Sequence, residues 1–520
     1  MSLVRRIDTP LPGIGPRPLV GLTSWPLCLL ICLASVAPLL VVDLPPLVDL
    51  YGHLGRYAVQ TDLANRPEIQ PYYSFEWRLI GNLGADLLVQ ALHGWLGLEM
   101  SVRVIVIAIQ FLGAAGILAV CHAVHGRVTP FALMALPLLY GFPFNYGFLN
   151  FALAMALGML AFTAWLHMTR MQRTWQARLW LAVAGAAIWV CHTYGWAFLG
   201  LLCGSTALAQ TLRAKDHPLA AARQIVGACW PLLLPLIPML LWRADAGGSE
   251  TGGWFVHLKI LWLLSPLRTK WFVLDFTSLL AIYALLYLAA RSKHLAFDRR
   301  LGIAASLCFA CFLILPMCVF SSMFADMRLM PYVLVIALLA ISVDRLGANK
   351  LKLLSLAAVA FFAGRMVTTG LAYIAQDREI AAALPTMEAI PKGARVAFFV
   401  IKPCEVEWQL PVLDHLGGIA LARRSVFVND QWQQPGVNLL DVHYPAVGAF
   451  DQDPSQMVLP DGCGNPQYPN FSPLMRQFPR RAFTHVWIIG ELPPAMPPIP
   501  GLEPLPHAGK GALYRVLDSD

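Results

Sequence analysis

Two carboxylates and a histidine follow the first hydrophobic stretch of this sequence. Residues 21–42 are apolar enough to cross a bilayer, and Asp43, Asp49 and His53 come soon after them. Ionisable groups at the mouth of such a span are costly unless they pair or act. Because Asp49 and His53 are four residues apart, a helix would place them on one face. We interpret this loop as a candidate acid–base site, and the alternative is a solvated loop after a transmembrane helix.

Two arginines at the ends of apolar runs are candidates for holding a phosphate. Arg328 lies in the segment FADMRLMP, close to Asp326, and Arg243 follows another apolar run. The planar guanidinium can hold two phosphate oxygens, which suits it to a lipid-linked phosphate at the membrane surface. Either arginine could instead anchor its helix at the interface. The weaker candidates of the same kind are Arg56, Lys259, Arg268 and Lys270.

Further polar residues fall at turns between apolar runs. His192 stands between two such runs, and Asn145 and Tyr146 occupy another turn. A histidine at a tight turn is more often a hydrogen-bonding residue than a ligand or base, whereas Asn145 could line a substrate cavity. The sequence contains no phosphate-cradling glycine-rich loop, Walker lysine, serine nucleophile elbow or zinc-binding HExxH motif.

The composition indicates that a membrane must position these residues. The 520-residue chain is 58% hydrophobic and only 13% charged, and its mean hydropathy is +0.60. These values exclude a soluble globule of ordinary surface composition. The net charge of +8 does not indicate nucleic acid, because Lys and Arg recur in short clusters between apolar spans. That distribution is typical of membrane topology.

Placing each basic cluster on the cytoplasmic side predicts eleven spans, with the N-terminus inside and the C-terminus outside. The predicted spans are residues 21–42, 102–124, 129–143, 149–168, 179–192, 194–211, 225–242, 272–290, 301–320, 329–344 and 353–375. Residues 77–97 carry too many polar groups for a span, and we predict a helix lying on the outer leaflet. The first stretch is interpreted as an uncleaved anchor rather than a signal peptide.

This topology, which was assigned from the basic clusters alone, places the unusual polar residues on the outer face. The residues that share that face are Asp43, Asp49, His53, Asn145, His192, Arg243, Asp245, Asp326 and Arg328. Such convergence is what a membrane active site requires. Arg365 is an exception, because it falls inside the last predicted span and has no evident partner.

The chain changes character after residue 376. Short apolar runs then alternate with turn residues, a pattern typical of strands in a small α/β domain. The expected strands are residues 395–401, 425–428, 485–489 and 512–516, and the expected helix is 413–423. We therefore predict a membrane module over residues 1–376 and an extracytoplasmic domain over residues 377–520.

Only two of the 11 cysteines, Cys404 and Cys463, fall outside the apolar spans. In an oxidising compartment they could form a disulfide, and the alternative is two separately buried thiols.

Together these features resemble the GT-C superfamily of polytopic glycosyltransferases. The likeness rests on an acidic first outer loop, membrane-peripheral helices, many spans and an outer C-terminal domain. The stretches Asp49 to Arg56, Asn145 to Phe151 and Asp326 to Pro331 are similar to stretches in bacterial members. The resemblance implies an α-helical polytopic fold, a polyprenyl-phosphate sugar donor and a first-loop carboxylate that assists the acceptor.

That carboxylate maps onto Asp49 or Asp43. The superfamily commonly has two adjacent acidic residues there, whereas Asp49 is followed by Leu50. The departure leaves open which group is the base and whether a divalent cation is needed.

The expected activity is therefore inverting transfer of a sugar from a polyprenyl-phosphate donor to a glycan, lipid or protein acceptor, on the outer face of a bacterial inner membrane. Asp49 would act as the base with His53 assisting, and Arg328 with Arg243 would hold the leaving phosphate. Further substrate contacts are expected from Asp326, His192, Asn145 and Arg56. No nucleic-acid partner is expected.

Two other functions fit parts of this pattern. A transporter or flippase for a lipid-linked saccharide also needs a cationic cavity with apolar walls, but the two halves of the sequence show no internal symmetry. A non-catalytic assembly protein would leave the ionisable first loop without a purpose.

Overall fold

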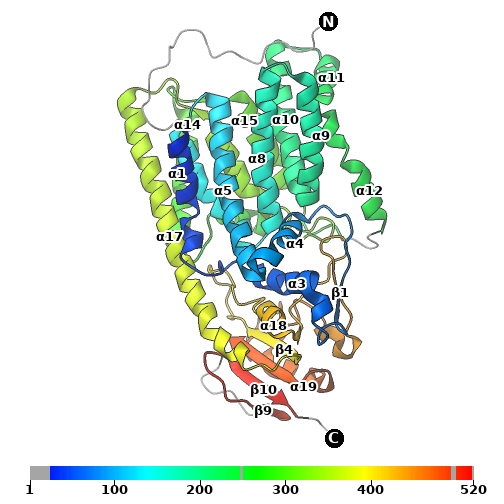
Figure 1. The fold of residues 1–520 in the computed structure, drawn as a ribbon. Helices are drawn as coiled ribbons and strands as arrows, with labels where there is room; N and C mark the ends of the chain where they lie inside the picture. Colours follow the sequence, from blue (N-terminus) through cyan, green and yellow to red (C-terminus); the bar gives the residue numbers. More distant parts are fainter. Residues whose placement is uncertain (1–23, 246–249, 493–498, 518–520) are drawn as a thin grey trace.

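The structure is a computed structural model that describes residues 24–245, 250–492 and 499–517. Figure 1 shows a bundle of helices with a smaller, sheet-containing region at one end. The bundle contains α1 (Trp25–Ser35), α2 (Ala37–Leu40), α5 (Leu98–His125), α6 (Pro130–Ala135), α8 (Leu149–Arg170), α9 (Thr174–Cys191), α10 (Thr193–Ala214), α11 (Pro218–Cys229), α12 (Leu236–Asp245), α14 (Phe272–Arg291), α15 (Arg299–Ile314), α16 (Met330–Leu339) and most of α17 (Ala348–Glu388).

Within the described residues, five helices are long and apolar enough to cross a membrane, namely α5, α8, α10, α14 and α17. The other predicted spans also contain helix, but it is shorter or broken. The predicted span 129–143 is divided among α6, the 3₁₀ helix η2 (Leu136–Tyr140) and α7 (Phe142–Tyr146). Prolines cause such breaks, because proline has no N–H to donate and clashes with the preceding turn. The prediction of eleven spans is thus confirmed only in part.

Two helices lie across the end of the bundle that faces the sheet (Figure 1). They are α3 (Leu50–Asp62) and α4 (Gly84–Leu96), and α4 replaces the longer surface helix predicted over residues 77–97. Leu87, Leu88 and Trp95 of α4 are exposed, whereas Asp86 is buried. A short helix with an exposed apolar face is typical of a helix at a membrane surface.

The C-terminal region is built on a mixed sheet with the strand order β5-β4-β8-β10-β9. Its strands are β4 (Arg395–Ile401), β5 (Phe427–Val428), β7 (Met457–Val458), β8 (His485–Gly490), β9 (Leu502–Pro504) and β10 (Ala512–Val516). Strand β4 is parallel to β5, β7 and β8, and β10 is antiparallel to β8. All four predicted strands are confirmed, because apolar runs between turns mark buried strands reliably.

The membrane bundle and the C-terminal region are joined by more than the chain connection. Helix α17 runs for 41 residues, past the predicted boundary at residue 376 and into the C-terminal region. Strand β1 (Tyr73–Phe75), which follows α3, pairs with β6 (Leu440–Val442). Helix α3 also packs on α18 (Gly417–Arg424), where a Cβ on Gly55 would lie 2.9 Å from the Cα of Gly418. Only glycines permit helices to approach this closely.

The predicted helix over residues 413–423 begins later than expected, at Gly417. Residues 411–416 instead form a turn that carries Asp414 and His415 against the end of the bundle.

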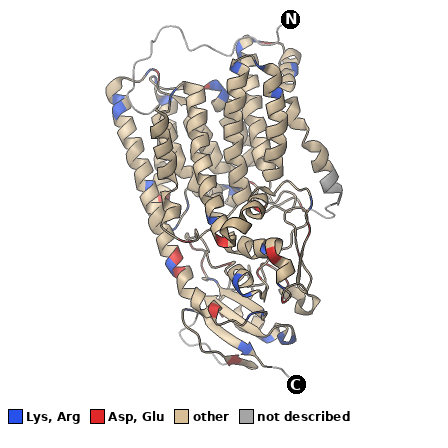
Figure 2. Ribbon diagram, in the orientation of Figure 1, with Lys and Arg blue, Asp and Glu red and all other residues tan. Residues whose placement is uncertain are grey.

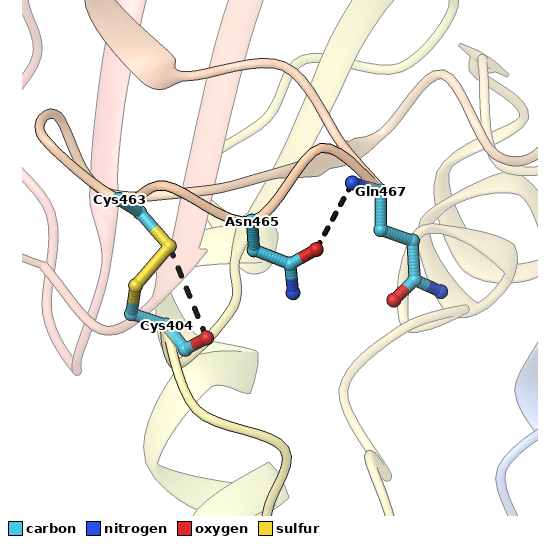
Figure 3. The surroundings of a disulfide bond; sticks show 4 residues. All are labelled: Cys404, Cys463, Asn465 and Gln467. Atoms are coloured by element: carbon cyan, nitrogen blue, oxygen red, sulfur yellow. Dashed lines mark hydrogen bonds between the residues drawn. A yellow bond between two sulfur atoms is a disulfide. The ribbon is translucent and has the colours of Figure 1, made fainter.

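Cys404 and Cys463 form a disulfide with an S–S distance of 2.06 Å (Figure 3), which confirms the pairing hypothesis. It links two loops that are 59 residues apart in the sequence. Beside it, the Gln467 N–H donates to Oδ1 of Asn465 at 3.0 Å.

Candidate active site

The loop before α3 is held in place by its backbone. The N–H of Val48 donates to the carbonyl of Asn145 at 3.1 Å, and the N–H of Asp49 donates to that of Tyr146 at 2.9 Å. Gly147, at φ +107°, lies against this loop, and a Cβ there would come within 2.9 Å of Asp49 Cβ. Both the positive φ and the close approach require glycine. The turn at residues 145–148 therefore fixes the position of Asp49.

The Asp49 carboxylate faces the C-terminal region. Asp49 precedes α3 at its N-cap, but its side chain makes no capping hydrogen bond. Instead, Oδ1 lies 3.7 Å from Nε2 of His415, and the two side chains are only 14% and 7% exposed. The His415 ring packs edge-on against Trp432 at 4.8 Å between centroids, and His53 packs edge-on against the same indole at 5.2 Å. Trp432 thus lies against two histidines that come from different parts of the chain.

The surroundings of Asp49 set its protonation near neutrality. Burial raises the pKa of Asp49 to about 7, with His415 and Arg328 lowering it and Asp453 and Asp414 raising it. A carboxylate with a pKa near the working pH is suited to accept a proton as a general base.

The two histidines beside Trp432 have opposite electrostatic environments. Burial and the nearby charge of Arg56 hold the pKa of His53 well below its usual value, so His53 is neutral. Burial also opposes charge on His415, but the surrounding carboxylates outweigh it and raise the pKa of His415. His415 is therefore the histidine that more readily carries a positive charge.

Arg328, in the 3₁₀ helix η4 (Met327–Leu329), is a buried cation that packs against aromatic rings. Its guanidinium stacks 3.9 Å from the centroid of the Phe148 ring. Nη2 donates to the carbonyl of Met323 at 2.9 Å, and Nη1 lies 3.2 Å from Nε2 of His192. Nε has no hydrogen-bond partner, and no carboxylate in the described part of the chain forms an ion pair with Arg328. A buried donor set of this kind suits an incoming anion.

His192 supplies a second hydrogen-bond donor beside Arg328. Its Nδ1 accepts a hydrogen bond from the Tyr194 N–H at 3.1 Å and caps α10. A neutral imidazole has only one acceptor nitrogen, so Nε2 then carries a hydrogen. Nε2 of His192 and Nη1 of Arg328, 3.2 Å apart, are then two hydrogen-bond donors that lie side by side, and an anion beside them would accept from both.

The turn at residues 145–148 brings the carboxylate and the guanidinium to one site. Asp49 lies against Gly147, and Arg328 stacks on the adjacent Phe148. The charge of Arg328 also lowers the pKa of Asp49, as expected of neighbouring opposite charges. This turn and the contacts above connect Asp49, His192 and Arg328, and His53 lies one helical turn after Asp49, so the proposed roles of these four residues stay predictions.

Three other predicted substrate contacts are engaged within the protein. Asp326 forms a 2.7 Å ion pair with Lys259, and Arg56 forms an ion pair with Asp86; all four side chains are buried. Asn145 donates to the carbonyl of Tyr140 at 2.7 Å and accepts from the Tyr373 hydroxyl at 2.7 Å. A sequence does not show which opposite charge a buried group will meet. In this structure each of these three side chains is therefore held by protein groups.

Asp43 is not part of this group. The Asp43 side chain is fully exposed and lies 3.6 Å from Arg103. Arg243 belongs to α12, but its side chain lies outside the described residues.

Arg365 has a partner that the sequence did not reveal. It donates to Asp275 at 2.9 Å and to the carbonyl of Leu267 at 3.0 Å. Asp275 also accepts from the Trp408 indole N–H at 2.9 Å, and Arg268 donates to the Trp408 carbonyl at 2.6 Å. This buried network ties the C-terminal region to the bundle, since a buried charge must be paired and hydrogen-bonded.

Sequence reasoning missed the contribution of the C-terminal region to the site. The missed residues around Asp49 and His415 are His415 itself, Asp414, Asp430, Trp432 and Asp453. Four of them lie in two polar segments that the sequence shows, the Asp-His-Leu-Gly-Gly turn at 414–418 and the run Asn-Asp-Gln-Trp at 429–432. No group of three or more His, Cys, Asp or Glu side chains in the described residues is arranged to hold a metal ion.

No family model and no curated protein matches this chain. Two solved structures are similar to it, both crystal structures of ArnT from Cupriavidus metallidurans. The structure bound to undecaprenyl phosphate has a TM-score of 0.49 and 13% identity, covering 94% of this chain and 98% of that chain. The apo structure has a TM-score of 0.46 and 12% identity, covering 94% and 97%. At this level of similarity neither structure assigns an activity or a ligand to this chain.

Proposed function

We propose that this chain is a GT-C-like membrane glycosyltransferase that transfers a sugar from a polyprenyl-phosphate donor to an acceptor hydroxyl, with inversion at the anomeric carbon. One observation carries the proposal. The buried Asp49 carboxylate packs against Gly147, and the Arg328 guanidinium, which has no carboxylate partner among the described residues, stacks on the adjacent Phe148 at the end of a bundle of apolar helices.

The chemistry follows from these two groups. Asp49 takes the proton of the acceptor hydroxyl as its oxygen bonds to the anomeric carbon, and the bond from that carbon to the phosphate oxygen breaks. Attack opposite the leaving phosphate inverts the carbon. Arg328 and the Nε2–H of His192 stabilise the negative charge that develops on the polyprenyl phosphate. Neutral His53, packed on Trp432, orients the base or the acceptor.

The location of the site supports a lipid-linked donor. Outside the cytoplasm no nucleotide pool supplies activated sugars, so an activated sugar must arrive on a lipid. Apolar helices flank the site, and the exposed apolar face of α4 lies at the same end of the bundle (Figure 1). A phosphate at the membrane surface, with its hydrocarbon chain among these helices, fits that arrangement.

The charge distribution supports an outer location for the site and the C-terminal region. Lys and Arg gather at the end of the bundle away from the sheet (Figure 2). Because basic loops stay in the cytoplasm, this end would be cytoplasmic and the C-terminal region extracytoplasmic.

This orientation predicts that the Cys404–Cys463 disulfide forms in cells, because disulfides persist in oxidising compartments. Protein denatured directly from cells and alkylated should label at Cys404 and Cys463 only after reduction, as measured by peptide mass. The exposed Cys311 is the control and should label without reductant. Full labelling of Cys404 and Cys463 without reductant would contradict the orientation.

Mass spectrometry of lipids and glycans in a deletion strain tests the activity. The loss of one sugar from an envelope component, with accumulation of the sugar-loaded polyprenyl phosphate, is expected. Wild-type protein should restore the sugar and the Asp49→Asn variant should not. Unchanged masses in the deletion strain would overturn the proposal, and full restoration by Asp49→Asn would exclude Asp49 as the base.

A further inference from the structure

The buried imidazole of His415 lies at the site but has no part in the chemistry proposed above. His415 lies in the turn before α18, and α18 packs through Gly418 against Gly55 of α3. This close packing places a side chain of the C-terminal region beside a carboxylate of the first loop. The contact between His415 and Asp49 is therefore built into the fold.

The hydrogen-bonding surroundings of His415 fix its tautomer. Nδ1 lies 3.4 Å from the backbone carbonyl of Asp430, which can only accept, so Nδ1 carries a hydrogen. Nε2 faces the Asp49 carboxylate at 3.7 Å. A proton on Nε2 therefore makes His415 a cation that faces Asp49.

The groups around His415 favour this cation. Asp49 faces it from the start of α3, Asp414 from its own turn, Asp430 from the loop after β5, and Asp453 from the loop before β7. Asp414 is also paired with Lys402 at 2.5 Å. His53, which packs edge-on against the same Trp432 indole, is neutral.

Donor binding would increase the importance of this contact. The two cations that lower the pKa of Asp49 are His415 and Arg328. A phosphate held by Arg328 would neutralise that cation and leave His415 as the positive charge facing Asp49. Without the charge of His415, burial would favour the protonated form of Asp49, which cannot act as a base.

We propose that protonated His415 is a positioning residue that keeps Asp49 ionised while the donor is bound, so that the C-terminal region completes the active site. This inference rests on the proposed glycosyl transfer with Asp49 as its base.

The test is the pH profile of sugar transfer by purified protein, with membranes of the deletion strain supplying donor and unmodified acceptor. An opposite charge at this range lowers the pKa of an aspartate by about 1 to 3 units. Loss of that charge in His415→Gln should therefore move the acid limb of kcat up by about 1 pH unit or more. Transfer on that limb should fall about tenfold at fixed pH, and it should recover on the alkaline plateau.

Two further variants separate charge from shape. His415→Lys restores a cation and should return the acid limb toward its wild-type position. His443→Gln changes an exposed histidine of the same region and should leave the profile unchanged. A wild-type profile in His415→Gln, or equal loss at every pH in both His415→Gln and His415→Lys, would overturn the inference. Absence of transfer by the wild-type protein would instead overturn the proposed function.

Discussion

Asp49→Asn is expected to lower sugar transfer by about 100- to 10,000-fold, the usual contribution of a general base. The amide keeps the size of the side chain but cannot take the proton of the acceptor. Folding should survive, because the carboxylate makes no capping hydrogen bond and the backbone contacts of Asp49 remain. The measurement is initial-rate transfer by purified protein, with size-exclusion chromatography as the check on folding.

Asp43→Asn is the matched control for this prediction. Asp43 is fully exposed and lies beside Arg103 on the surface, so its loss should leave transfer near the wild-type rate. Near-normal transfer by Asp49→Asn together with an inactive Asp43→Asn would move the base to Asp43. Activity in both variants would remove this loop from the chemistry.

Arg328→Ala should lower transfer by about 100- to 1,000-fold, which is the usual effect of removing one hydrogen-bond donor from an oxyanion hole. Arg328→Lys keeps the charge but loses the bidentate fork and much of the stacking on Phe148, so a smaller loss is expected. Both variants should also bind a polyprenyl phosphate less tightly than the wild type, as measured by native mass spectrometry.

Arg103→Lys serves as the control, because it keeps a partly exposed charge at a distance from the site. Its transfer rate and lipid binding should match those of the wild type. Wild-type affinity for the polyprenyl phosphate in Arg328→Ala would exclude Arg328 from the phosphate site.

The fold was predictable where its causes are local. The apolar runs that become α5, α8 and α10, and the strands β4 and β8, are visible in the sequence because hydropathy and turn residues act over a few neighbours. The broken helices were harder to foresee, because a proline-containing apolar run can remain one span or divide. The extent of α17 past residue 376 depends on its packing in both regions, which no local pattern shows.

About half of the candidate site was predictable in the same way. The sequence places unusual polar residues at the ends of apolar runs, namely Asp49, His53, His192 and Arg328. Because ionisable groups at the membrane cost free energy unless they have a role, these residues could be chosen as candidates. The same criterion also selected Arg56 and Asp326. Burying these charges is costly too, but Asp86 and Lys259 form ion pairs with them.

The sequence by itself determined that this is a membrane protein with ionisable groups gathered at one end of its spans, because burial cost depends only on residue type and the surrounding run. Only the tertiary structure decided which of those groups stay uncompensated. It paired Arg56 and Asp326 and left Arg328 without a carboxylate partner among the described residues. It also carried His415 onto Asp49 across more than three hundred residues of chain. Partner choice between distant charges depends on how helices such as α3 and α18 pack, and that packing is set by contacts across the whole chain.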